Sequence, residues 1–203
     1  MDHTEFIMEI KNIISQDFID KILPIVDKKA KKNLKVGMGW KKDGINKNIR
    51  NVKGYSLDLK TPTNLFYWNY IKKEIERVYV YYKIKFPRMS SCVINQIDLL
   101  KYSVGGKYEV HTDHFSDVAR HLSIIINLND NYEGGDLIFT DQKQKEIKRL
   151  KLSKGSVVFF PSNFMYPHGI QPITKGTRYA INCFLTLSDN KIQQMKEKGF
   201  YEI

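Results

Sequence analysis

The chain has 203 residues, of which 42% are hydrophobic and 12% aromatic, a composition that suits one soluble domain with a sizeable core. No run approaches the ~18 apolar residues of a membrane span, and the first residues lack the pattern of a secretory signal. We therefore expect a cytoplasmic protein that does not contact a membrane.

The net charge of +11 is concentrated in one stretch of the chain. Residues 21–60 hold 12 Lys or Arg against 3 Asp or Glu, an excess of nine positive charges. Such a patch can attract nucleic acid or an acidic polypeptide. Lysines dominate it, however, so a merely solvated basic surface is the competing interpretation.

Two helices are predicted in the first part of the chain. Ser15 can cap the first, and Pro24 is expected to kink or interrupt it before Lys32. The second can start at Thr61, because apolar side chains then recur at steps of three and four residues: Leu65, Trp68, Ile71, Ile75, Val78 and Tyr82. Residues 35–60, rich in Gly, Asn and Lys, indicate loops and short edge strands.

After Pro87 the sequence changes to short runs that are typical of strands and are separated by turn residues. These runs are Val93–Tyr102, Tyr108–Asp113, His121–Leu128, Asp136–Phe139, Ile147–Leu152, Val157–Phe160 and Arg178–Leu187. Many short strands without intervening helices predict an antiparallel jelly roll. We expect one domain, mainly β, with a cupin-like double-stranded β-helix over 88–188. Residues 1–87 would support it, and the tail 189–203 would include a short helix near 190–198.

Cys92 and Cys183 both lie in apolar runs that are typical of strands. Nothing in the sequence marks a secreted protein, so two buried thiols are expected in preference to a disulfide.

A His-x-Asp pair, His111 and Asp113, follows the turn residues Gly105 and Gly106. Side chains two positions apart point the same way on a strand, so both can enter one cavity. A distant His168 would complete the two-histidine, one-carboxylate set that binds Fe(II) on one side and leaves the opposite positions open. Taken alone, the pair could instead satisfy buried backbone groups.

The segment YSVGGKYEVHTD, residues 102–113, resembles the iron-binding signature of prolyl 4-hydroxylase-like 2-oxoglutarate oxygenases. Further matches follow in the family's order: HLSIIINLN (121–129), YEGGDL (132–137), KGSVVFF (154–160), HGI (168–170) and GTRYAIN (176–182). The resemblance spans about half of the chain. It is specific because several independent motifs agree in order and spacing.

By position, the resemblance implies that His111, Asp113 and His168 are the Fe(II) ligands. It also implies that Arg178 holds the distal carboxylate of 2-oxoglutarate, a role that suits a planar guanidinium able to bind a carboxylate through two parallel hydrogen bonds. Tyr102 matches a family tyrosine whose hydroxyl helps to hold the co-substrate. A surface salt bridge for Arg178 and a core position for Tyr102 are the ordinary alternatives.

Strand alternation extends this predicted site. Asn182 and Phe184 share the face of Arg178, so Asn182 is a candidate for the co-substrate site and Phe184 for the substrate pocket. Asp98 and Gln96 share the face of Tyr102 and are further pocket candidates. The alternative for Phe184 is packing in the barrel without a substrate contact. The alternative for Asp98 and Gln96 is a polar lip of the barrel that needs no partner. Asn127 stands where some relatives have a second such tyrosine. His114 should project to the opposite face from Asp113 if the strand continues, which favours a position outside the set of metal ligands.

The implied activity is that of an Fe(II)- and 2-oxoglutarate-dependent dioxygenase. Such enzymes consume O2, convert 2-oxoglutarate to succinate and CO2, and use ascorbate as a reductant. The resemblance favours peptidyl proline as substrate, as in procollagen-proline 4-dioxygenases, with a proline-containing peptide or protein as partner. Residues 35–60 and 113–120 are the candidates for substrate-binding loops.

Two other functions compete with prolyl hydroxylation. The first is an oxygenase that acts on another side chain or on nucleic acid. Demethylases of alkylated bases, however, carry a second arginine six residues after the anchor, where this chain has Phe184. The second is a jelly-roll binding module without catalysis. The sequence gives no indication of the oligomeric state.

Overall fold

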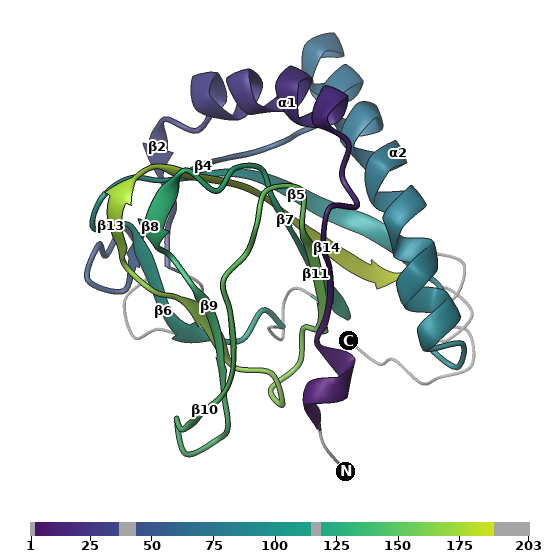
Figure 1. Cartoon of the computed structure of the whole chain (residues 1–203). Coiled ribbons are helices and arrows are strands. Elements are labelled where there is room, and N and C mark those ends of the chain that lie inside the picture. The colour runs from purple at the N-terminus through teal and green to yellow at the C-terminus, as the bar shows by residue number, and fades with distance from the viewer. Residues whose placement is uncertain (1–2, 37–43, 115–118, 189–203) are drawn as a thin grey trace.

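A computed structural model describes residues 3–36, 44–114 and 119–188, and Figure 1 draws the rest as a thin grey trace. The expected helix near 190–198 lies outside the described residues. The elements are η1 (His3–Phe6), β1 (Met8–Ile10), α1 (Gln16–Lys29), β2 (Lys32–Asn33), β3 (Arg50–Asn51), β4 (Lys53–Ser56), α2 (Pro62–Lys85), β5 (Cys92–Tyr102), β6 (Lys107–His111), β7 (Leu122–Asn127), β8 (Tyr132–Gly134), β9 (Leu137–Thr140), β10 (Glu146–Leu150), β11 (Val157–Pro161), β12 (His168–Ile170), β13 (Ile173–Gly176) and β14 (Arg178–Leu187).

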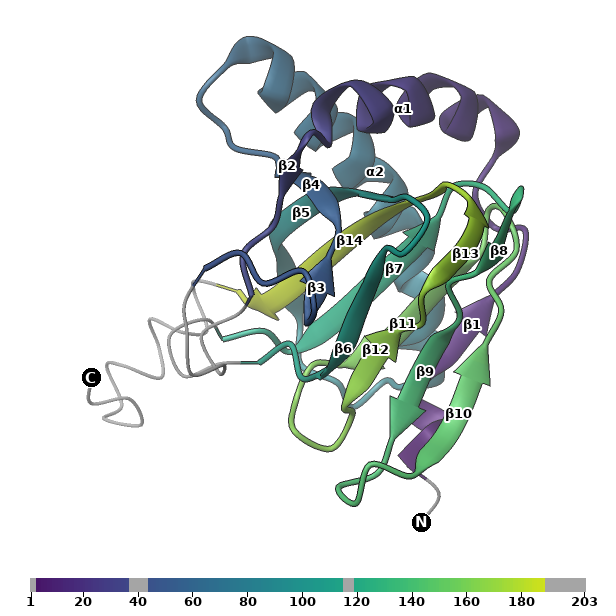
Figure 2. The same ribbon diagram turned by 90° about the vertical axis from the view of Figure 1, so that its left-hand side faces the viewer.

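Two antiparallel sheets form the body of the domain. The larger has seven strands in the order β1-β11-β7-β14-β5-β4-β2, and the smaller has five in the order β10-β9-β12-β6-β3. A two-stranded sheet, β13-β8, lies at one end of the barrel (Figures 1 and 2). Every pairing between the described strands is antiparallel. The expected double-stranded β-helix with preceding helices is therefore confirmed.

The two helices cover the outer face of the seven-stranded sheet (Figure 1). Their buried side chains, among them Ile22, Val26, Ile71 and Ile75, form one core with the outward-facing residues of that sheet. A second core fills the space between the two sheets and includes Leu100, Tyr102, Phe139, Phe160 and Ala180. Period-two alternation along each strand divides its side chains between these two cores.

The helix ends follow their predicted caps. Ser15 Oγ accepts a hydrogen bond from the Phe18 amide at 3.2 Å, and Thr61 Oγ1 accepts one from the Asn64 amide at 3.2 Å. The expected interruption at Pro24 is wrong, because α1 continues through it to Lys29. Pro24 is exposed, so the carbonyl that loses its helical partner lies on the solvent side, while the opposite face is held by the buried core.

Several strands differ from their predicted boundaries. The strand expected to include Asp113 ends at His111, and the short strands β1, β8, β12 and β13 were not predicted as strands of their own. Within 35–60, β3 is a short edge strand as expected, whereas β4 is short but lies between β5 and β2. No disulfide joins the two cysteines: Cys183 is buried and Cys92 is half-buried.

Helix α1 is tied to the sheet through one carboxylate. Asp27 accepts hydrogen bonds from the Tyr179 hydroxyl at 2.6 Å and from Lys101 Nζ at 2.5 Å. These hydrogen bonds, first that from Lys101 and then that from Tyr179, lower the pKa of Asp27. Lys101 and Tyr179 are cross-strand partners on β5 and β14. Their chain neighbours Tyr102 and Arg178 form the next pair and belong to the inner face.

In the part of the chain that the structure describes, neither helix combines the length and apolar character needed to cross a membrane.

Replacing the proline inside α1 should stabilise the protein. Proline in a helix interior costs about 3 kcal/mol relative to alanine, offset by up to ~1 kcal/mol through its restriction of the unfolded chain. Pro24→Ala should therefore raise the free energy of unfolding by about 2 kcal/mol in urea titrations. Ser15→Ala, which removes the cap, should lower it by about 1 kcal/mol. A destabilised Pro24→Ala protein would contradict this account of α1.

Candidate active site

The register between β6 and β12 brings two histidines together. His168 pairs with His111 and Ile170 with Tyr108, so three steps on β6 match two on β12 through a bulge. The His111 and His168 ring centroids are 4.5 Å apart. The bulge also lets Tyr108 stack on His111 with ring centroids 3.6 Å apart.

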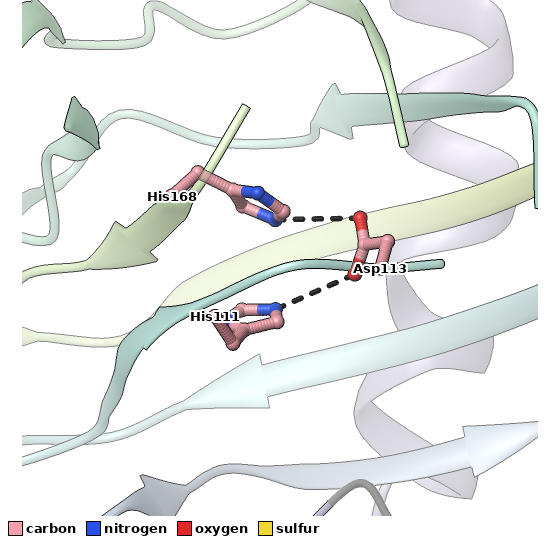
Figure 3. A group of neighbouring side chains, drawn as sticks. All are labelled: His111, Asp113 and His168. Atoms are coloured by element: carbon pink, nitrogen blue, oxygen red, sulfur yellow. Dashed lines mark ion pairs between the residues drawn. The ribbon is translucent and has the colours of Figure 1, made fainter. Parts of the chain in front are cut away.

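Asp113, just beyond the end of β6, completes the group (Figure 3). His111 Nε2 lies 3.4 Å from Asp113 Oδ1, and His168 Nε2 lies 3.3 Å from Asp113 Oδ2. The three ligand atoms lie within 4.8 Å of one another. Metal bonds of about 2.1 Å at right angles place ligand atoms about 3.0 Å apart, so this group could hold a divalent metal with one side open.

Hydrogen bonds outside the group fix the orientation of each candidate ligand. His111 Nδ1 lies 2.8 Å from the Glu109 carbonyl oxygen and His168 Nδ1 lies 3.1 Å from that of Tyr166, so each Nδ1–H donates and each Nε2 points at the site. Ser123 Oγ donates to Asp113 Oδ2 at 2.7 Å. Sequence reasoning missed Ser123. The available signal was a polar residue among apolar neighbours on the same strand face as Asn127.

The protonation states suit metal binding. Burial, followed by repulsion from His168, lowers the pKa of His111 to about 4, so its imidazole is neutral near pH 7. Burial by itself would raise the pKa of Asp113, but the electrostatic effect of the adjacent His168 and His111 imidazoles holds it well below its ordinary value. A neutral imidazole and an ionised carboxylate are the forms that bind a metal ion.

Arg178 is buried on the inner face of β14, with 1% of its surface exposed. Its Nε donates to Asn127 Oδ1 at 3.0 Å, and its guanidinium carbon lies 5.3 Å from the centre of the Tyr102 ring. Nη2 is buried without a hydrogen-bond partner, and no described carboxylate forms an ion pair with this side chain. A buried guanidinium needs an anion. The distal carboxylate of 2-oxoglutarate fits this requirement.

Asn127 occupies the place where some relatives have a tyrosine, and here it positions the arginine. Its Nδ2 donates to the carbonyl oxygens of Asn129 at 2.6 Å and Leu152 at 3.1 Å, which leaves Oδ1 facing Arg178. Tyr132 also donates its hydroxyl to Asn127 Oδ1, at 3.3 Å. Tyr132 was not predicted as part of the site, because its segment, residues 132–137, was used only as one of the motifs that resemble the family.

The remaining predicted residues lie on β5 and β14, where Asp98 pairs with Asn182 and Gln96 with Phe184. Asn182 Oδ1 is buried without a partner. Asp98 accepts hydrogen bonds from Ser56 Oγ at 2.5 Å and from Gln96 Nε2 at 2.9 Å.

His114 is exposed, and its Nδ1 contacts the Arg120 carbonyl oxygen at 2.8 Å. It is not a member of the metal-binding group, as the strand argument predicted.

An apolar cavity of about 670 Å³ lies elsewhere, between the end of α2 and the ends of β7, β11 and β14. Its walls include Phe6, Phe86, Met89, Leu122 and Leu187, and none of the predicted site residues lines it. This cavity is therefore separate from the predicted site residues.

Residues 97–186 match the 2OG-Fe(II) oxygenase superfamily, and this segment holds His111, Asp113, His168 and Arg178. The predicted resemblance to Fe(II)- and 2-oxoglutarate-dependent oxygenases is therefore confirmed for this segment of the chain.

Among curated proteins, the chain is 36% identical over 69 residues to prolyl 3-hydroxylase 2 of Homo sapiens. This match covers 34% of the chain but only 10% of that much longer relative. The chain is 22% identical over 179 residues to a PKHD-type hydroxylase of Idiomarina loihiensis, covering 86% of the chain and 75% of the relative.

Solved structures agree on the fold. A prolyl hydroxylase from Trichoplax adhaerens, in complex with a hypoxia inducible factor oxygen degradation domain peptide, has a TM-score of 0.74 at 17% identity, over 95% of this chain and 87% of that one. A prolyl-4-hydroxylase from Pseudomonas putida has a TM-score of 0.66 at 14% identity, over 90% and 93% of the two chains.

Metal binding should raise the thermal stability of the protein only when the group is intact. With Mn(II), which resists oxidation by air, at 100 times its dissociation constant, the folded state should gain about 2.7 kcal/mol and the melting midpoint should rise by roughly 5–10 °C. His111→Ala should abolish the shift, and His114→Ala should retain it, as measured by differential scanning fluorimetry. An equal shift in both variants would place the metal elsewhere.

Proposed function

We propose that the chain hydroxylates proline in a peptide or protein substrate to 4-hydroxyproline, with Fe(II) held by His111, Asp113 and His168. In this proposal Arg178 anchors 2-oxoglutarate, which is converted with O2 to succinate and CO2. The observation that carries it is the buried Arg178, which forms no ion pair with any described carboxylate and lies on the inner face of the same barrel as the His-Asp-His group. The metal and co-substrate supply the oxidising chemistry when bound.

The chain's own residues would bind and orient the co-substrate, and they exclude water from the site. The Asn127 amide oxygen fixes Arg178 by accepting from its Nε, and the Tyr102 ring lies against the guanidinium. Burial raises the pKa of Tyr102, so its hydroxyl stays protonated and can donate a hydrogen bond to the co-substrate. Phe160 and Phe139 pack on His168 with ring centroids 4.5 Å and 5.8 Å away, which keeps one side of the site dry.

The choice of proline is supported by the names of the relatives and by the resemblance of the motifs. The relatives include both prolyl 3-hydroxylases and structures of prolyl 4-hydroxylases. We propose hydroxylation at the 4-position, with ascorbate as the reductant that keeps the metal in its Fe(II) state. Oxidation of alkylated bases is not favoured, because the position six residues after Arg178 is Phe184.

Arg178 should govern the affinity for 2-oxoglutarate. Arg178→Lys keeps a charge but loses the planar fork and the Nε donor to Asn127, so KM for 2-oxoglutarate should rise roughly tenfold or more, the scale of one charge-assisted hydrogen bond. Succinate formation at varied 2-oxoglutarate measures this. Arg149→Lys, at an exposed ion pair, is the matched control and should leave KM unchanged. A normal KM in Arg178→Lys would remove Arg178 from the co-substrate site.

Substrate hydroxylation should be visible as a mass gain of one oxygen atom on proline. Purified protein with Fe(II), ascorbate and 2-oxoglutarate should form succinate slowly alone and faster with proline-containing peptide libraries, and His111→Ala should do neither. Amino-acid analysis separates 3- from 4-hydroxyproline. Oxygen gained only on residues other than proline would overturn the prolyl assignment. Absence of succinate under all conditions would contradict the oxygenase reaction itself.

A further inference from the structure

The six arginines of this chain divide into two groups. Arg77 and Arg149 are exposed and form ion pairs with glutamates, and Arg88 is exposed. Arg50, Arg120 and Arg178 are half-buried or buried, and no ion pair with a described carboxylate is formed by any of them. Burial without a counter-charge is costly. Arg178 is explained by the co-substrate, but Arg50 and Arg120 are not.

Arg120 contacts the candidate metal ligand Asp113, and its hydrogen-bond partners among the described residues are neutral. Its Nη2 donates to Gln96 Oε1 at 2.7 Å, and its Nη1 donates to the Asp113 carbonyl oxygen at 3.2 Å. Its guanidinium carbon lies 3.7 Å from the centre of the Phe184 ring, which fixes the plane of the group. Nε is buried without a hydrogen-bond partner.

Arg50 has a similar arrangement next to the other ligand. Its guanidinium carbon lies 4.5 Å from the centre of the Tyr108 ring, which in turn stacks on His111. Its Nη1 donates to the Lys35 carbonyl oxygen at 2.8 Å, and its Nε is buried without a partner. Two guanidiniums, each stacked on an aromatic ring, therefore flank the candidate metal ligands.

The two arginines also act on each other. Burial, attraction to Asp113 and Asp98, and repulsion from Arg50 all act on the pKa of Arg120, and the net effect lowers it. The carboxylate of Asp98 is already occupied by Ser56 and Gln96. The carboxylate of Asp113 already contacts Ser123 and the two histidines. An additional anion that contacts both arginines would offset this repulsion.

We propose that Arg50 and Arg120 bind a carboxylate of the substrate, close to the carbon that is hydroxylated. This inference rests on the proposed function and narrows its substrate class to proline next to an acidic group. Two sources share this chemistry: the side chain of a neighbouring Asp or Glu, and the α-carboxylate of the proline itself. A planar carboxylate matches the planar guanidinium in a way that an amide does not, because only the carboxylate is charged and accepts on both oxygens.

Binding of matched charged and neutral ligands tests the proposal without turnover. The full chain would be loaded with Mn(II) and 2-oxoglutarate under anaerobic conditions and titrated calorimetrically with three pairs. These are acetyl-Pro-Glu-amide against acetyl-Pro-Gln-amide, acetyl-Glu-Pro-amide against acetyl-Gln-Pro-amide, and L-proline against L-prolinamide. In at least one pair the charged member should bind about tenfold or more tightly. Which pair it is identifies the source of the carboxylate.

The preference for the charged member, rather than the affinity itself, reports on the arginines. Arg120→Gln and Arg50→Gln should each reduce it to near unity, Arg120→Lys should retain part of it, and Arg88→Gln, an exposed control, should retain all of it. A preference that persists in both glutamine variants, equal binding of the members of every pair, or binding of none of them would overturn the proposal.

Failure of this inference can be told from failure of the proposed function. Equal binding within each pair, together with hydroxylation of proline peptides, removes only the role of the two arginines. Absence of succinate in the oxygenase assay removes the proposed function, whatever the binding experiment gives.

Discussion

The pairing of β6 with β12 is the constraint on which the site depends. Without the bulge between the two strands, three steps along β6 could not match two along β12. The bulge puts His111 opposite His168 and keeps Tyr108 on the same face as His111. Asp113 then needs only a short exit from β6 to reach both imidazoles. A slip of one residue in this register would turn one histidine to the other face of the sheet.

Buried charge organises the interior of the barrel around that register. The positive charge of Arg178 is held on the inner face of the seven-stranded sheet by a neutral amide, Asn127. The carboxylate of Asp113 is held by two imidazoles and the Ser123 hydroxyl. Each of these charged groups has polar neighbours within the chain that fix its position. Its main counter-charge would be supplied by a bound ligand or metal ion. Such an arrangement is costly for stability and is typical of sites that bind charged ligands.

Much of this could be predicted from the sequence. The helix caps Ser15 and Thr61 are local signals, and both determined where a helix begins. Strand alternation placed Asn182 and Phe184 inside and Ile181 and Cys183 outside, because period two holds along a long strand.

What could not be predicted depends on tertiary contacts. The bulge between β6 and β12 has no local signature, and the strands that flank the site at β8 and β12 are only three residues long. The predicted interruption at Pro24 was wrong because the effect of a proline depends on which side of the helix faces solvent. Ser123 and Asn127 looked like ordinary polar residues in a strand. Their roles come from what β6 and β14 bring next to them.

The carboxylate of Asp27 has a consequence for the far side of the sheet. It holds Tyr179 and Lys101 against α1, and the next pair along the same two strands is Arg178 with Tyr102. Asp27→Asn would weaken the contact between α1 and the two strands one residue from Arg178, the proposed 2-oxoglutarate anchor. The exterior helix is thus joined, through one side chain, to the strand pair whose next residues face the barrel interior.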